Sequence, residues 1–235
     1  MINYSQRIGQ ILKEFTQIHS VIPGKFLRET PFVFNFTKEN KEILNIDPKD
    51  SAAFSRYITK KLERSGKILG IGKYGEDRTI YRSNLYTSTS ESRSIHLAID
   101  LFVPVGAEVF TPLDGIIHSF QDNNKFLDYG PTIILEHDIS DIKFYTLYGH
   151  LNRTSLKGLI VGRKVLAGER IARVGRENEN GSWPPHLHFQ IITDLLGFTG
   201  DFPGVAKPSE KEYYLALCPD PNLLLRILPP STNAF

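Results

Sequence analysis

Hydrophobic positions in the first third of the chain recur with helical spacing. In residues 5–18, apolar side chains return every three or four positions, which is typical of an amphipathic helix. Residues 51–65 show a second apolar face; Asp50 or the serine after it can cap this helix, and Gly66 suits its C-terminal end. We therefore expect helices mainly in residues 1–66.

The chain between the second helix and residue 95 predicts two short strands and a loop. Lys67–Ile71 and Thr79–Tyr81 have the composition of strands, and the turn-prone residues 74–77 separate them. Ser83–Ser94 is rich in serine and threonine, which is typical of a loop or linker.

From residue 95 onward, short β-rich runs alternate with Gly, Pro and Asp at close spacing, as in antiparallel sandwiches and barrels. We predict an α+β fold with a mostly antiparallel β-sandwich or open barrel in residues 93–193. Residues 1–92 form a mixed helical extension, and residues 194–235 form a tail that packs on the core. The predicted strands are Ile95–Val103, Glu108–Phe110, Gly115–Phe120, Thr132–His137, Lys143–Leu151, Arg170–Val174 and Leu187–Thr193.

The predicted tail combines a short helix with an apolar patch. Glu210–Leu217 has the pattern of a helix, and two prolines follow it at Pro219 and Pro221. The three leucines of Leu223–Leu225 come next, and we expect them to pack against the core.

The composition restricts the kinds of site that the chain can build. Of its 235 residues, 40% are hydrophobic and 23% charged, as in an ordinary globular protein. Cys218 is the sole cysteine, which excludes an internal disulfide and a cysteine-based metal cluster. Any metal site must therefore use mainly His, Asp or Glu.

The charge is nearly balanced, at +2, although residues 1–90 carry a net +6 and residues 91–235 a net −4. Basic residues form no run longer than a pair such as Lys60-Lys61, so we expect no nucleic-acid partner.

The N-terminal sequence lacks the apolar run of a signal peptide, and no segment approaches the length of an apolar membrane span. We expect a cytoplasmic protein, with export by another route left open; the oligomeric state is also open.

The chain has seven histidines, which are the clearest candidates for catalytic or metal-binding residues. Four of them, together with one aspartate, form three groups with regular spacing. His96 and Asp100 are separated by three residues, His150 follows Tyr148-Gly149, and His186 and His188 are separated by one. On a strand, residues two or four apart share a face. Two of the groups therefore bury apolar neighbours on one face and present imidazoles and a carboxylate on the other.

This set of side chains suits a zinc site. Catalytic zinc keeps three protein ligands and an open position for water, so four histidines and one aspartate leave two spare imidazoles. A neutral imidazole can accept a proton near neutral pH, which suits a general base. We interpret the other three histidines as structural or surface residues; His137, at the end of an apolar strand, is expected to make a structural hydrogen bond.

The order of these motifs, His-x-x-x-Asp, Tyr-x-His-Leu and His-Leu-His-Phe, resembles the lysostaphin/LytM-type zinc metallopeptidases. Two flanking segments, Asp100–Ile117 and Gly162–Gly175, also resemble that family. The likeness covers about residues 93–193. Trp183–Ile191 and Asp201–Val205 resemble a branch whose peptidase-like domain lies beside phosphotransferase-like and class III aminotransferase-like domains.

The resemblance implies a role for each motif residue. His96, Asp100 and His188 would bind one Zn²⁺ per chain, while His150 and His186 would be the catalytic imidazoles. We predict that one of the two takes a proton from the water and the other stabilises the oxyanion; Tyr148 and Tyr86 are weaker candidates for a supporting hydrogen bond. The family hydrolyses peptide bonds in peptidoglycan cross-bridges or stem peptides.

This sequence departs from the family at two positions and in one larger feature. Ala98 replaces the usual glycine, and Pro184-Pro185 stiffens a normally Gly/Ser-rich approach to His186. Because peptidoglycan lies outside the cytoplasmic membrane, a cytoplasmic member would act on another substrate, such as a soluble peptide or amide. We therefore predict a zinc metalloendopeptidase acting on a peptide or a peptidoglycan stem peptide.

Other functions explain the sequence less well. Residues 112–117 and 164–169 resemble the half-motifs of biotinyl and lipoyl carrier domains, but the modifiable lysine motif is absent. A catalytically inactive peptidase-like module that binds cell-wall fragments or a protein partner is the main alternative, although such proteins normally lose a ligand. A serine or cysteine hydrolase is disfavoured, since no Gly-x-Ser-x-Gly motif occurs.

Overall fold

The computed structural model describes residues 4–47, 49–81 and 91–229. The strands are β1 (Phe32–Val33), β2 (Gly70–Gly72), β3 (Ile95–His96), β4 (Ile99–Phe102), β5 (Glu108–Phe110), β6 (Gly115–Asn123), β7 (Gly130–Ile139), β8 (Ile142–Gly149), β9 (Lys164–Val165), β10 (Arg170–Arg173), β11 (Leu187–Ile192) and β12 (Val205–Ala206). The α-helices are α1 (Tyr4–Glu14), α2 (Lys41–Leu44), α3 (Ser51–Ser65), α4 (Lys211–Leu217) and α5 (Asn222–Leu225). The 3₁₀ turns are η1 (Gly24–Leu27), η2 (Thr79–Tyr81), η3 (Arg153–Leu156) and η4 (Pro208–Glu210).

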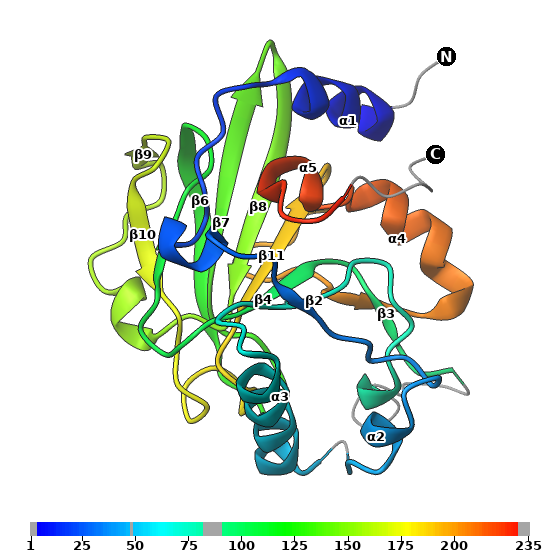
Figure 1. Cartoon of the computed structure of the whole chain (residues 1–235). Coiled ribbons are helices and arrows are strands. Elements are labelled where there is room, and N and C mark those ends of the chain that lie inside the picture. The colour runs from blue at the N-terminus through cyan, green and yellow to red at the C-terminus, as the bar shows by residue number, and fades with distance from the viewer. Residues whose placement is uncertain (1–3, 48, 82–90, 230–235) are drawn as a thin grey trace.

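An eight-stranded sheet of order β1-β2-β4-β11-β8-β7-β6-β9 organises the fold (Figure 1). Only the β1–β2 pair in this sheet is parallel, and the other neighbours are antiparallel. Two small antiparallel sheets, β10-β5 and β12-β3, accompany it. The predicted α+β class with a mostly antiparallel β region is confirmed.

The N-terminal extension is part of the same sheet. Strands β1 and β2 continue the sheet beyond β4, because the backbone of residues 70–72 pairs with residues 100–102. The predicted boundaries after residues 92 and 193 stay predictions. The residues before 93 nevertheless share the sheet that carries Asp100.

The predicted helices agree with the structure except in length. Asp50 accepts a hydrogen bond from the backbone N–H of Ala53 at the start of α3, and Gly66 ends that helix with φ of +66°. The first helix stops at Glu14 rather than residue 18. Beyond Glu14 the backbone forms a long-range hydrogen bond instead of continuing the helix: the N–H of His19 donates to the carbonyl of Pro112.

Three strand predictions are wrong in detail. Thr79–Tyr81 forms a 3₁₀ turn, which lets the side chains of Ile80 and Tyr81 pack in the same cluster rather than on opposite faces of a strand. The strand predicted from Lys67 begins at Gly70, because the N–H of Lys67 still caps the preceding helix through the carbonyl of Leu62. The long predicted strand Ile95–Val103 is split into β3 and β4.

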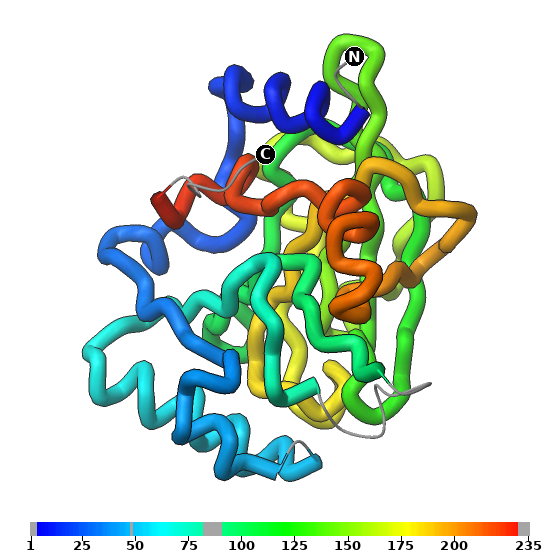
Figure 2. Tube along the Cα trace, turned by 90° about the vertical axis from the view of Figure 1, so that its right-hand side faces the viewer, coloured from blue at the N-terminus to red at the C-terminus, as the bar shows by residue number. Residues whose placement is uncertain are grey.

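The main core lies on one face of the large sheet. Ile8 and Leu12 of α1 and Leu224 of α5 belong to the same buried cluster as Leu101 and Phe189. Figures 1 and 2 show α1 and α5 close together, and Arg226 donates a hydrogen bond to the carbonyl of Leu12. The apolar patch of the tail therefore packs on the core, as predicted.

Two further apolar clusters flank the opposite face. One surrounds α3 and includes Phe36, Phe54 and Trp183. The other includes Leu147 and Phe202, with Leu215 and Leu217 of α4 packed against it. The candidate residues of the sequence analysis lie between these two clusters.

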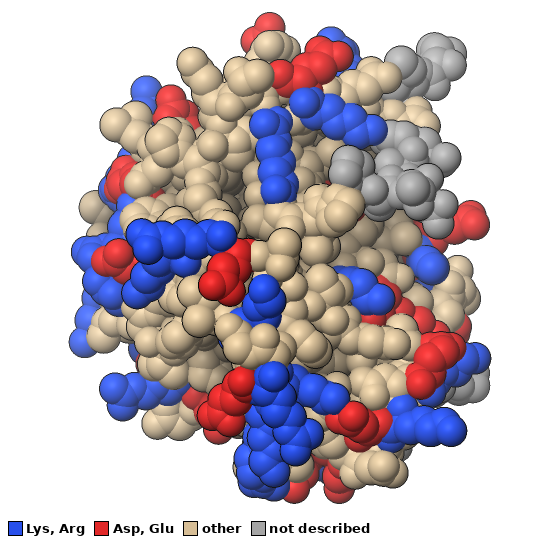
Figure 3. All heavy atoms as spheres, viewed as in Figure 1, with Lys and Arg blue, Asp and Glu red and all other residues tan. Residues whose placement is uncertain are grey.

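The surface gives little further indication of a partner. Basic and acidic side chains are interspersed with uncharged ones over the face in Figure 3. In the described ranges, no helix is both long enough and apolar enough to cross a membrane.

Candidate metal centre

Strands from two different sheets bring the three predicted zinc ligands together. His96 ends β3, Asp100 lies in β4 and His188 in β11, where His188 is the direct cross-strand partner of Asp100. Their neighbours Leu101 and Phe189 point into the main core, so the polar side chains occupy the other face. The alternation along the strands predicts this arrangement.

The distances between the three side chains fit a tetrahedral metal. Asp100 Oδ1 lies 3.2 Å from His96 Nε2 and 3.2 Å from His188 Nδ1, and the two nitrogens are 3.4 Å apart. Bonds of about 2.0–2.1 Å in a tetrahedral zinc site put ligand atoms about 3.3–3.4 Å apart. Within the described part of the chain, this is the only such trio of His, Cys, Asp or Glu side chains.

Hydrogen bonds select the ring nitrogens that face the centre. His96 Nδ1 donates to the carbonyl of Lys73 at 3.1 Å, which leaves Nε2 as an acceptor. His188 Nε2 contacts Gln190 Oε1 at 3.0 Å and the Tyr129 hydroxyl at 3.3 Å, which leaves Nδ1 facing Asp100. Gln190 is oriented by its own amide, which donates to the carbonyl of Pro203.

The fit also explains an isolated oxygen. Asp100 Oδ1 is buried, and no donor among the described residues meets it with hydrogen-bond geometry. An acceptor of this kind is costly to bury unless a cation or donor satisfies it. The residues present therefore fit a divalent metal, although the roles of individual residues stay predictions.

The electrostatics of the site hold its groups in metal-binding form. Burial, together with the positive charge of Arg78, lowers the pKa of His96 to about 4. Burial alone would raise the pKa of Asp100, but His96 and Arg78 hold it well below its ordinary value. At neutral pH the imidazole is neutral and the carboxylate ionised, as metal binding requires.

The two predicted catalytic imidazoles lie beside the trio. His150 follows the end of β8, and His186 immediately precedes β11. Their ring centroids are 4.2 Å apart, and His186 Nε2 is 3.7 Å from Asp100 Oδ1. The Nδ1–H of His150 donates to the carbonyl of Asn180 at 2.8 Å, and that of His186 to the carbonyl of Pro184 at 2.6 Å.

Both rings are neutral at physiological pH. Burial lowers the pKa of His186. Burial and the neighbouring rings of His186 and His188 lower the pKa of His150 well below its ordinary value. With Nδ1 protonated in each ring, each Nε2 is free to accept a proton.

The suggested supporting role of Tyr148 is wrong. Tyr148 packs on Phe189 in the main core, where its hydroxyl accepts a hydrogen bond from Thr146. It does not share a face with His150, because the strand ends at Gly149 and His150 has φ of +61°. The other suggested tyrosine, Tyr86, lies outside the described residues.

The remaining histidines stay outside the metal trio. His137 makes the expected structural hydrogen bonds: its Nδ1–H donates to the carbonyl of Asp114 at 2.8 Å, and its Nε2 contacts the Thr146 hydroxyl at 2.7 Å. His118 contacts the hydroxyl of its neighbour Ser119 on β6. His19 packs against Gly168.

A cleft of about 710 Å³ gives access to the centre. Asp100, His150, His186 and His188 line it, beside aromatic side chains that include Tyr81 and Trp183. Charged side chains of both signs also line it: Arg93, Lys125, Asp128 and Asp201.

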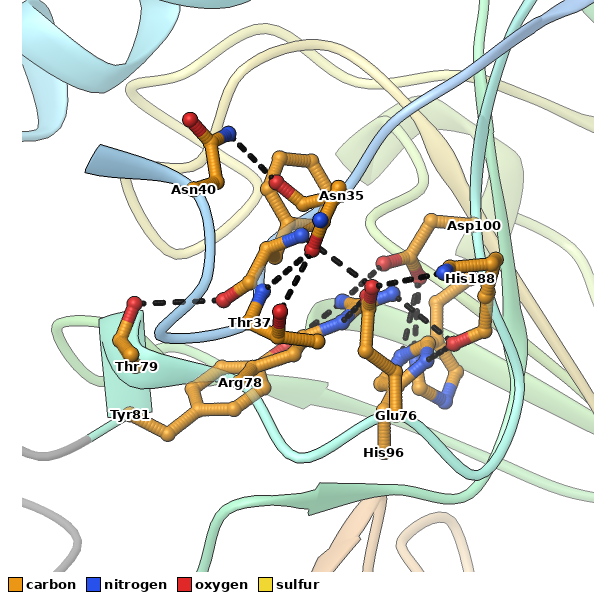
Figure 4. A network of polar contacts seen from close by, with 12 residues as sticks. Asn35, Thr37, Asn40, Glu76, Arg78, Thr79, Tyr81, His96, Asp100 and His188 are labelled. Carbon is orange, nitrogen blue, oxygen red and sulfur yellow. Dashed lines mark hydrogen bonds and ion pairs between the residues drawn. The ribbon is translucent and has the colours of Figure 1, made fainter. Parts of the chain in front are cut away.

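Sequence reasoning missed a group of residues around the metal trio. Arg78 is buried and donates to Asp100 Oδ2 at 2.6 Å, as Figure 4 shows. Residues 72–78 have the composition of an exposed turn, so no sequence pattern indicated this burial. Tyr129 and Gln190 were missed as well; Gln190 lies two residues after His188 on the same face of β11, which is a usable signal.

Comparison with known proteins identifies related sequences. Residues 94–197 match the sequence model of Peptidase family M23. The chain is 30% identical over 112 residues to an "Uncharacterized metalloprotease" of Buchnera aphidicola subsp. Baizongia pistaciae (strain Bp), covering 47% of this chain and 27% of that protein. It is 29% identical over 102 residues to the "Peptidoglycan DD-endopeptidase ShyA" of Vibrio cholerae serotype O1, covering 41% and 20%. The chain thus spans about a quarter or less of each curated relative.

Solved structures with similarity to this chain include two peptidases. A zinc-containing peptidase from Vibrio cholerae has 28% identity and a TM-score of 0.34, over 42% of this chain and 27% of that one. The catalytic domain of lysostaphin from Staphylococcus simulans has 26% identity and a TM-score of 0.36, over 52% and 80%.

Proposed function

We propose that the M23 peptidase domain in residues 94–197 of this chain makes it a zinc-dependent hydrolase of peptide bonds. The spacing of three potential ligand atoms carries the proposal. His96 Nε2, Asp100 Oδ1 and His188 Nδ1 lie 3.2–3.4 Å from one another, close to the edges of a tetrahedral zinc site. We assign these residues as the ligands of one Zn²⁺ per chain.

The chain's own residues supply the proton transfers. When bound, zinc supplies Lewis-acid chemistry, lowering the pKa of water and polarising a carbonyl group. The free Nε2 of one ring, His150 or His186, takes the proton of the attacking water. The other ring, when protonated, donates its Nε2–H to the developing oxyanion, and the proton taken from water passes to the leaving amine. Because the rings are 4.2 Å apart and buried, two adjacent cations are disfavoured, which favours transfer of the base's proton onward to the leaving amine.

The proposed substrate is a peptide, of the kind found in peptidoglycan stems or cross-bridges. The relative in Vibrio cholerae is described as a peptidoglycan DD-endopeptidase, which supports this class. The cleft supports it too, since Arg93 and Lys125 can pair with carboxylates, and Asp128 and Asp201 with amines. A stem peptide carries both kinds of group.

Two finer predictions remain part of the proposal. If the protein is cytoplasmic, its substrates are soluble peptides or amides rather than peptidoglycan. The hydrolysis test therefore includes both soluble peptides and peptidoglycan fragments. The resemblance of Trp183–Ile191 and Asp201–Val205 to a branch found within longer multidomain proteins is checked by sequencing the complete gene.

Hydrolysis assays test the proposal. The zinc-loaded chain is incubated with purified sacculi, cross-linked stem peptides and simple peptide amides, and new amines are identified by mass spectrometry. We expect cleavage of a peptide bond, loss of cleavage with a chelator and recovery with zinc. His118→Ala serves as the matched histidine control, because His118 lies on β6 outside the trio. If the zinc-loaded protein binds these peptides but cleaves none, it is a binding module.

A further inference from the structure

A buried chain of charges reaches the metal trio from the N-terminal extension. Arg78 Nε donates to Glu76 Oε2 at 3.2 Å, and Arg78 Nη1 donates to Asp100 Oδ2 at 2.6 Å. All three residues are at most 6% exposed. Charges buried to this degree are tolerated only when each is paired, so the three side chains form one interdependent unit.

The two carboxylate oxygens of Asp100 have different partners. The guanidinium occupies Oδ2, while Oδ1 faces the rings of His96 and His188. Figure 4 shows the Arg78 side chain extended between Glu76 and Asp100. The arrangement leaves one oxygen, Oδ1, for a metal and prevents the carboxylate from turning.

The guanidinium is itself fixed from several sides. Nη1 also donates to the Tyr81 hydroxyl at 3.2 Å, and Nη2 donates to the carbonyl of Lys73 at 3.3 Å. The Phe36 ring lies 5.0 Å from the guanidinium carbon, within the range of a cation–π contact. Arg78 therefore has a single orientation available.

The same segment orients a second ligand candidate. The carbonyl of Lys73, which accepts from Arg78, also accepts from His96 Nδ1 at 3.1 Å. Backbone hydrogen bonds join the segment to β3: the N–H of His96 donates to Glu76, and the N–H of Gly75 donates to His96. Residues 73–78 thus contact two members of the trio from outside the 94–197 match.

We infer that residues 73–78 complete the zinc centre, with Arg78 as the positioning residue that presents Asp100 as a one-oxygen ligand. The inference rests on the proposed zinc site but not on hydrolysis. Residues behind metal ligands typically change metal affinity about 10–100-fold when they are replaced. Without Arg78, Glu76 and Asp100 would be two buried carboxylates with no shared cation, and Asp100 could rotate away from the trio.

Zinc affinity, measured by competition with a chromogenic chelator, tests the inference on the full-length protein. We expect Arg78→Met to weaken zinc binding about 10–100-fold. Arg78→Lys should cause a smaller loss, because its ammonium group keeps the positive charge but lacks the several N–H donors of the planar guanidinium. Glu76→Gln should also weaken binding, since it releases Arg78 while keeping an acceptor for the N–H of Phe36. Arg173→Met is the matched control, because Arg173 pairs with Glu108 on a different sheet.

A spectroscopic readout separates positioning from a general loss of structure. The Co²⁺-loaded Arg78→Met variant should show an altered visible absorption spectrum, because its carboxylate can bind through both oxygens; the spectrum of Arg173→Met should match the wild type. Far-UV circular dichroism establishes that each variant is folded. Glu76→Gln decides the matter if Arg78→Met does not fold.

Three results are distinguishable. Folded Arg78→Met or Glu76→Gln with zinc affinity within twofold of the wild type, or tighter, would overturn the inference. Wild-type protein that binds zinc but hydrolyses no peptide would overturn the proposed activity alone. Wild-type protein that binds no zinc would overturn both.

Discussion

The imidazole rings of His150 and His186 lie with centroids 4.2 Å apart, tilted by 38° to each other. Each ring donates its Nδ1–H to a backbone carbonyl, of Asn180 and Pro184 respectively. The two rings therefore have the same tautomer and keep the same atom, Nε2, for chemistry. This arrangement places two proton acceptors beside His96, Asp100 and His188.

Alanine at either imidazole should reduce hydrolysis and leave metal binding intact. General acid–base groups contribute about 10²–10⁴-fold in rate, so we expect His150→Ala and His186→Ala each to lower kcat by about that factor. Zinc content, measured by mass spectrometry on the same samples, should stay at one per chain.

Either half of that expectation can fail separately. Loss of zinc from one variant would make the replaced residue a ligand. Wild-type rates in both variants would remove both residues from the mechanism. His118→Ala, on β6, provides the baseline for a histidine outside the site.

Gln190 should contribute to metal affinity through His188. Its Oε1 contacts His188 Nε2 at 3.0 Å and so favours the ring form that presents Nδ1 to the metal. We expect Gln190→Met to weaken zinc binding about 10–100-fold in chelator competition. Tyr129→Phe should have a smaller effect, because the Tyr129 contact is longer at 3.3 Å. Equal zinc affinity in Gln190→Met and the wild type would contradict this role.

Acid should destabilise the metal-free fold through His137. Burial lowers the pKa of His137 to about 4, whereas the unfolded chain has the ordinary value near 6.5. Between these values the unfolded state binds a proton that the folded state does not, so stability is full above pH 6.5 and falls towards pH 4. The contribution of this residue over the whole window is about 3 kcal/mol.

Urea unfolding between pH 4 and 7.5, in the presence of a chelator, measures this effect. His137→Gln removes the titrating group, so its free energy of unfolding should fall less on acidification than that of the wild type. Parallel pH profiles for the two proteins would show that His137 does not contribute.

The candidate site was predictable from sequence because its chemistry follows strand periodicity. The His-x-x-x-Asp and His-x-His spacings predict side chains on one face of a strand. His96 and Asp100 still meet at 3.2 Å although Leu97 and Ala98 separate β3 from β4. The apolar faces were equally predictable, since Leu101 and Phe189 alternate with the polar residues.

Long-range contacts were not predictable in this way. Arg78 is buried because a backbone ladder joins residues 75–78 to 94–96 and because Glu76 and Asp100 compensate its charge, and neither cause is visible in local composition. Thr79–Tyr81 has strand composition but forms a 3₁₀ turn, since the surrounding aromatic cluster accepts both Ile80 and Tyr81. The supporting role suggested for Tyr148 was wrong because His150 adopts a positive φ after the strand ends, so the two residues do not share a face.

The zinc content of the purified protein and of Asp100→Ala is the most direct test of the whole account. Both proteins are dialysed against a metal buffer of defined free zinc, and the bound metal is measured by inductively coupled plasma mass spectrometry. The account predicts one zinc per wild-type chain and none in Asp100→Ala. The substitution removes the proposed ligand atom Oδ1, which lies 3.2 Å from His96 Nε2 and 3.2 Å from His188 Nδ1. Stoichiometric zinc in folded Asp100→Ala, or no zinc in the wild type, would contradict it.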